Sequence, residues 1–162
     1  MEARTASQPS YPFQLSLRIR HPSIDPAAIS RALQIEPEHS FRAGEPRESA
    51  RNTAVTPVHG ESYWLATLDP AALLLGTALA PDISPQTHAI TFSVLDSALT
   101  VLITSVLRRH AEFFRRMESE GGEVRLIVSV SARKTRGFTL TPHLSRALSE
   151  LRIPVDFELA HR

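Results

Sequence analysis

The chain contains two similar strand–helix units, and this repetition constrains its fold more than any other feature. Alternating apolar and polar residues predict one strand at residues 13–20 and another at 123–130. A capping residue and a proline open a helix after each strand, and these pairs are Asp25 with Pro26 and Thr141 with Pro142. Both helices contain the tetrapeptide Ser-Arg-Ala-Leu. The repetition predicts one sheet built from two similar halves.

Two further strands, a short helix opened by Asp69 and Pro70 that extends to about Leu79, and one long helix complete the predicted elements. Apolar and aromatic residues predict strands at residues 62–68 and 155–159. From Leu95 to Met117 apolar residues recur every three or four positions, which predicts a helix of about twenty residues or more. The pattern leaves open whether residues 95–120 form one helix or two.

The order of these elements favours an α+β fold. Strand–helix–strand, a long helix, and strand–helix–strand again are typical of a ferredoxin-like, split β-α-β arrangement. We therefore expect a four-stranded, mainly antiparallel sheet with helices on one face and a long inserted helix. The length suits a single α+β domain over residues 11–162, after a flexible N-terminal tail at residues 1–10. Alternation predicts that four side chains share one buried face: Leu17, Ile19, Leu126 and Val128.

Composition is typical of an ordinary globular protein and argues against several classes of partner. A net charge of +1 and 6% aromatic residues provide neither the field nor the stacking rings of a nucleic-acid binder. No segment approaches the roughly 18 apolar residues that span a bilayer, and the N-terminus lacks the apolar run of a secretory signal. Without cysteine there are no disulfides or thiolate sites. We expect a cytoplasmic protein that binds neither membrane nor nucleic acid.

Patterns that carry catalysis or metal binding do not occur in the sequence. The seven histidines are not spaced like metal ligands, either with one another or with nearby carboxylates. There is no nucleophile elbow and no glycine-rich phosphate loop. We therefore expect no catalytic residue, no metal and no cofactor, and the sequence favours a protein that is not an enzyme.

The best candidates for a binding site lie in a long segment without periodicity, residues 38–60, and in the strand that follows it. Long loops in compact domains are often functional, and tryptophan and arginine dominate interface energies. We expect a groove beside the first helix, with Arg42 exposed and Trp64 only partly buried. In a structural alternative, Trp64 anchors the core and Gly44 only supplies a positive φ. The five candidate residues are Phe41, Arg42, Gly44, Glu45 and Trp64.

A wider pattern contains these candidates. Its members are Asp25, Pro26, Ile29, Leu33, Pro37, Phe41, Gly44, Glu45 and Trp64. With this pattern the chain resembles a bacterial family known as domain of unknown function 4279, over roughly residues 13–159. The resemblance implies a bacterial, cytoplasmic protein of this architecture, and it implies no reaction.

Together these observations favour a non-enzymatic binding module, immunity-like or regulatory, that contacts a protein partner through an irregular segment on a rigid sheet. The alternative is a small enzyme or a small-ligand-binding domain with a pocket near Arg42 and Trp64. The sequence does not identify the partner, and it leaves homodimer formation open.

Overall fold

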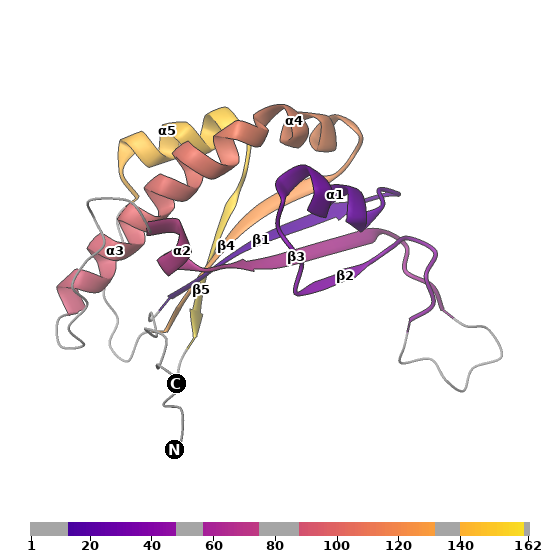
Figure 1. Cartoon of the computed structure of the whole chain (residues 1–162), viewed down its shortest axis with the longest axis horizontal. Helices are drawn as coiled ribbons and strands as arrows, with labels where there is room; N and C mark the ends of the chain where they lie inside the picture. The colour runs from indigo at the N-terminus through magenta and orange to yellow at the C-terminus, as the bar shows by residue number, and fades with distance from the viewer. Residues whose placement is uncertain (1–12, 48–56, 75–87, 132–139, 161–162) are drawn as a thin grey trace, which may run out of the picture.

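One mixed sheet with helices on one of its sides forms the body of the protein (Figure 1). The computed structural model describes residues 13–47, 57–74, 88–131 and 140–160; the predicted tail at residues 1–10 lies outside them. Within these ranges the sheet has five strands in the order β2-β3-β1-β4-β5. The strands are β1 (Phe13–His21), β2 (His39–Phe41), β3 (Ser62–Leu68), β4 (Glu123–Ser131) and β5 (Val155–Ala160).

The helical layer lies above the sheet in Figure 1. Its members are α1 (Pro26–Leu33), α2 (Pro70–Leu74), α3 (His88–Val101), η1 (Leu102–Val106), η2 (Leu107–His110), α4 (Ala111–Ser119) and α5 (Pro142–Leu151). The predicted caps are present. The Asp25 carboxylate accepts the backbone N–H of Ala27 at 2.9 Å, and the Thr141 hydroxyl accepts that of Leu144 at 3.3 Å.

The predicted α+β class is confirmed, but the four-stranded sheet is not. The fifth strand is β2, which lies in the segment expected to be a loop and pairs with β3. The ferredoxin-like layout is not confirmed either. In a split β-α-β unit another strand separates the two strands that the helix joins. The first unit has this form, because α1 joins β1 to β2 and β3 lies between them, but the second unit does not. The second unit, β4-α5-β5, joins adjacent parallel strands.

The core lies between the sheet and the helices. The predicted buried face is confirmed, because Leu17, Ile19, Leu126 and Val128 have no exposed surface. The antiparallel register places Leu17 directly opposite Leu126. The helical layer completes this core with buried side chains that include Ile29, Leu102, Ile103, Met117 and Leu148.

The long helix is continuous from His88 to Ser119 but changes its geometry on the way. After α3 the chain forms a π-turn at η1 and a 3-10 turn at η2, and then α4 follows. The Thr104 hydroxyl donates to the Thr100 carbonyl at 2.7 Å, a contact that bends helices. At the start of α4, the N–H of Ala111 bonds to the carbonyl of Arg108, three residues back. The sequence left open whether this region forms one helix or two. The structure shows one helical segment with an irregular centre.

Two glycines end α4 in a Schellman motif. The N–H of Gly122 donates to the Met117 carbonyl at 2.7 Å, and that of Gly121 donates to the Glu118 carbonyl at 3.0 Å. Gly121 has a φ of +83°, which glycine adopts without strain.

The end of β1 packs against this motif through His21, which is 5% exposed. Its Nδ1 accepts the N–H groups of Ser23 and Ile24 at 3.1 and 2.9 Å, so the proton of the neutral ring is on Nε2, 3.4 Å from Glu120. A Cβ on Gly122 would lie 2.8 Å from Cδ2 of His21. The imidazole therefore holds the β1–α1 turn, and Gly122 leaves room for it.

Substitution of Leu102 tests which face of the long helix is buried. Leu102→Ala should lower the free energy of unfolding by roughly 2–5 kcal/mol, because Leu102 has no exposed surface. Arg116→Ala, which removes an exposed pair with Glu120 and a cation–π contact with Phe113, should cost at most about 1 kcal/mol. Urea denaturation measures both, and equal losses would show that the buried face has been assigned incorrectly.

A second prediction concerns the acceptor role of His21. In His21→Asn the amide oxygen can take the position of Nδ1, whereas His21→Leu leaves two N–H groups without an acceptor. We expect the leucine variant to be less stable than the asparagine variant by at least about 1–3 kcal/mol. Urea midpoints at pH 7 provide the comparison. Equal stability of the two variants would contradict the acceptor role.

Candidate functional site

The candidate segment belongs to a hairpin arm, which we define as residues 42–47 and 57–61. The arm continues the β2–β3 pairing beyond the sheet and extends to the right in Figure 1. Gly44 N–H donates to the His59 carbonyl at 2.8 Å, and His59 N–H donates to the Glu45 carbonyl at 2.9 Å. Pro46 and Val58 form a further bridge. Both ends of the predicted loop are therefore paired, whereas residues 48–56 lie outside the described chain.

Two of the five candidates shape the turn of this arm. Gly44 has a φ of +86°, as the structural alternative required. The Glu45 carboxylate accepts the backbone N–H of Arg42 at 2.9 Å. Ala43 N–H donates to the hydroxyl of the buried Ser62 at 3.0 Å, which ties the turn to the sheet.

The expectation that Trp64 partly lines an open groove is wrong. Trp64 has no exposed surface, and its indole N–H donates to the Ser30 hydroxyl on α1 at 3.0 Å. The reason is the alternation along β3. It turns Trp64 toward the helices and its neighbour Tyr63 toward the opposite side, which we call the open face. Trp64 is therefore the core anchor of the structural alternative.

Three rings form a stack on the open face at the base of the arm. The centroid of Phe41 lies 3.7 Å from that of His59 and 5.1 Å from that of Tyr63, with interplanar angles of 20° and 11°. All three rings remain partly exposed. Arg42, the residue that follows Phe41, is exposed, and its guanidinium makes no hydrogen bond or ion pair with any residue that the structure describes. Sequence reasoning missed Tyr63 and His59, although the position of Tyr63 next to Trp64 in an alternating strand was a signal for it.

The centre of the open face carries a network of opposite charges, in which Nε of Arg18 is buried with no hydrogen-bond partner among the described residues. The register places Arg18 and Arg125 directly opposite each other, an arrangement that needs counter-charges. The Asp156 carboxylate lies within 3.5 Å of both guanidiniums, and Glu123 accepts two further bonds from Arg125. The hydrogen bonds from Arg125 lower the pKa of Glu123 below its ordinary value, although partial burial opposes this shift. We interpret this network as structural.

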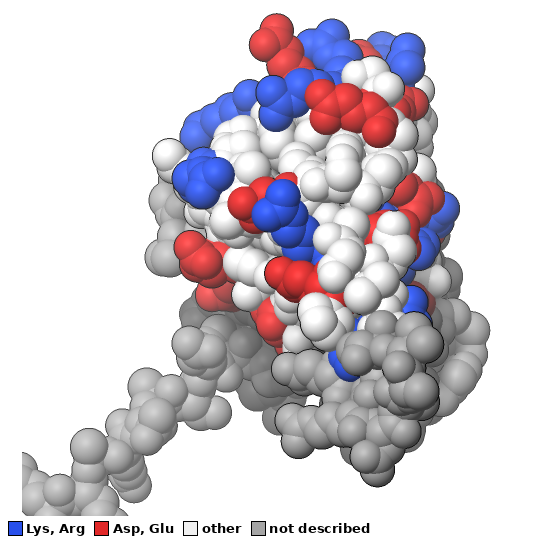
Figure 2. Space-filling view, turned by 90° about the vertical axis from the view of Figure 1, so that its right-hand side faces the viewer, with Lys and Arg blue, Asp and Glu red and all other residues white. Residues whose placement is uncertain are grey.

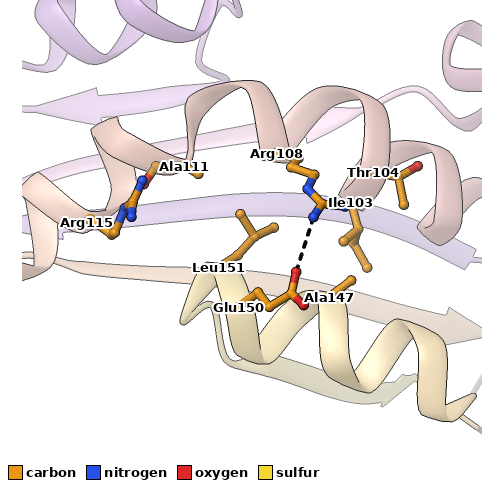
Figure 3. Close-up of a pocket in the computed structure, with 8 residues that line it drawn as sticks. All are labelled: Ile103, Thr104, Arg108, Ala111, Arg115, Ala147, Glu150 and Leu151. Atoms are coloured by element: carbon orange, nitrogen blue, oxygen red, sulfur yellow. Dashed lines mark hydrogen bonds and ion pairs between the residues drawn. The ribbon is translucent and has the colours of Figure 1, made fainter.

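A hollow of about 180 Å³ opens on the helical side, between the irregular centre of the long helix and α5 (Figure 3). Arg108 and Glu150 form an ion pair of 3.4 Å across it. Its lining consists of Ile103, Thr104, Arg108, Ala111, Arg115, Ala147, Glu150 and Leu151. None of these residues was a candidate from the sequence, because the hollow depends on how two helices meet.

Acidic and basic side chains are intermingled on the face that Figure 2 presents. Where the structure describes the chain, no helix is long and apolar enough to cross a membrane. In those same ranges, no three His, Asp or Glu side chains gather as metal ligands would.

No family model matches the chain, and no curated protein or solved structure is similar to it. The resemblance to domain of unknown function 4279 therefore stays a prediction.

The lowered pKa of Glu123 makes a pH-dependent prediction. A carboxylate of this kind stabilises the fold fully above its unfolded pKa, about 4.3, and the contribution is lost as the pH falls through its folded pKa. Glu123→Gln should therefore cost most near neutral pH, by less than about 1 kcal/mol because Glu123 is 40% exposed.

Urea denaturation of both proteins between pH 7 and pH 3 measures this difference, which should shrink toward the acid end. Glu112→Gln, on the exposed face of α4, serves as the control. A difference that stays constant or grows with acid would contradict the assigned pair.

Proposed function

We propose that this chain is a non-enzymatic protein-binding module, immunity-like or regulatory, whose contact surface is the base of the hairpin arm. This arm surface consists of Phe41, Arg42, His59 and Tyr63. The observation that carries the proposal is the stack of three partly exposed rings, with an exposed arginine next to Phe41 in the chain that has no partner among the described residues. We place the module in the bacterial cytoplasm, as the family resemblance implies.

The energetics of protein interfaces support this surface. Aromatic and arginine side chains contribute most of the binding energy in many complexes. Phe41 is held between two other rings, so it would lose little conformational freedom when a partner covers it. Such preorganised rings suit recognition, because the entropy cost of ordering them has already been met in folding.

The five residues predicted from the sequence divide into two roles in this proposal. Phe41 and Arg42 would contact the partner. Gly44 and Glu45 would set the turn that presents them, and Trp64 would support β3 from the core side. The enclosure of Trp64 counts against the alternative of an enzyme or ligand pocket between Arg42 and Trp64, and no observation favours that alternative.

Site-specific photocrosslinking in cells that produce the protein tests the arm surface. A photoreactive residue at position 42 should crosslink one defined protein, whereas the same residue at position 31, an exposed arginine on α1, should not. Adding Tyr63→Ala to the position-42 probe should remove most of the product, because the ring stack would be broken.

Stability measurements separate binding from folding. Arg42→Ala should leave the melting temperature within a few degrees, as Arg31→Ala should, because both side chains are exposed. With the photoreactive residue moved to position 41, Arg42→Ala should abolish the crosslink and Arg31→Ala should preserve it. If Arg42→Ala unfolds the protein, or if the crosslink persists without Arg42, the proposed surface is wrong.

A further inference from the structure

The hollow between the long helix and α5 is separate from the arm surface and has the shape of a small binding site. Its volume is about 180 Å³. A cavity of roughly 150 Å³ in another protein holds benzene, so this hollow has room for about six non-hydrogen atoms. It is open to solvent on one side. It lies where the long helix meets α5 (Figure 3).

The floor of the hollow is apolar and exists because two positions carry small side chains. Ile103 and Leu151 are buried beneath it. Ala111 from α4 and Ala147 from α5 lie at its sides, where a longer side chain would fill the space. An apolar group of a ligand would therefore be removed from water here.

The rim of the hollow has an excess of positive charge. Arg108 and Arg115 are seven positions apart on one side of the helix and lie toward opposite ends of the hollow (Figure 3). Nε of Arg115 donates to the Ala111 carbonyl at 3.3 Å, which holds the side chain along the helix and leaves its terminal N–H groups available. The single carboxylate, Glu150, lies 3.4 Å from Arg108 and is itself exposed.

The backbone at this place is also unusual. Ile103 and Thr104 come from the π-turn η1, and Arg108 comes from the 3-10 turn η2. Short π segments are rare and often lie at functional sites. An irregular helix, an apolar floor and two guanidiniums thus coincide at one hollow.

We propose that this hollow binds a carboxylate that carries a short apolar tail. The tail would contact Ile103 and Leu151, and the carboxylate would accept hydrogen bonds from Arg115, with Arg108 adding attraction from the other end. Guanidinium groups match the planar geometry of a carboxylate, which favours this class of anion. Glu150 competes for Arg108 and so limits the affinity.

Titration of the isotope-labelled full chain with sodium butanoate at low ionic strength, followed by NMR, tests the site. Butanoate has about six non-hydrogen atoms and should bind saturably, with a Kd of roughly 1–10 mM, and shift the amide signals of α5 and η1. Butylammonium, with the same tail and the opposite charge, should not bind. Shifts that grow linearly without saturation, or equal binding of butylammonium, would overturn the proposal.

Matched variants assign the effect to this site. Arg115→Gln should weaken butanoate at least fivefold, whereas Glu150→Gln should strengthen it, because the competing carboxylate is gone. The control Arg116→Gln, one position along and outside the hollow, should leave the Kd unchanged. Equal losses in Arg115→Gln and Arg116→Gln, or weaker binding in Glu150→Gln, would overturn the proposal. All three side chains are exposed, so these variants should fold.

A final comparison identifies the source of the carboxylate. A free short-chain acid and the C-terminal residue of a peptide present the same chemistry. If butanoate binds more tightly than acetyl-glycyl-valine, the ligand is a free acid, and the reverse order assigns the site to a chain terminus. Binding of neither compound would contradict the proposal.

Discussion

The pairing of β1 with both of its neighbours is the constraint on which the rest of the structure depends. β1 pairs with β3 on one side and with β4 on the other, and both pairings are antiparallel. The apolar side chains of β1 at Leu15, Leu17 and Ile19 have no exposed surface, so the central strand forms the floor of the core. Since successive residues of a strand point to opposite sides, fixing this face also fixes the other. The charged network and the ring stack therefore lie on the open face, because the apolar residues that alternate with them occupy the core face.

The two candidate sites are built from different elements: the arm surface from strands of the sheet, and the hollow from helices. The arm surface is an extension of strand pairing: Phe41 faces Tyr63 across the β2–β3 ladder, and the turn at Gly44 brings His59 onto the other side of Phe41. The hollow is built from helices, and its space is left by Ala111 and Ala147 where bulkier residues would close it. The arm surface is carried by paired strands, whereas the hollow is a gap between the side chains of two helices. They can therefore be altered independently.

Local signals predicted local structure well. The caps at Asp25 and Thr141 depend on a few adjacent residues and were found from the sequence. Features that depend on distant partners were not. The three-residue β2 exists because β3 offers it a pairing edge, and the burial of Trp64 reflects which side of β3 faces α1. Residue type alone indicated Phe41 and Arg42 as candidate binding residues. The ring stack becomes visible only from the strand register, and the hollow only from the packing of the helices.

The order of the strands has a consequence for synthesis on the ribosome. β1 is made first, yet its partner β4 lies roughly a hundred positions further along the chain, at Leu17 and Leu126 for example. Folding of such non-local contacts is slow, because a large loop must close before they form. A nascent chain that has not reached β4 carries one uncovered apolar edge of the future core. A chaperone or a partner that shields this edge would act during translation, before α5 has been made and the hollow can form.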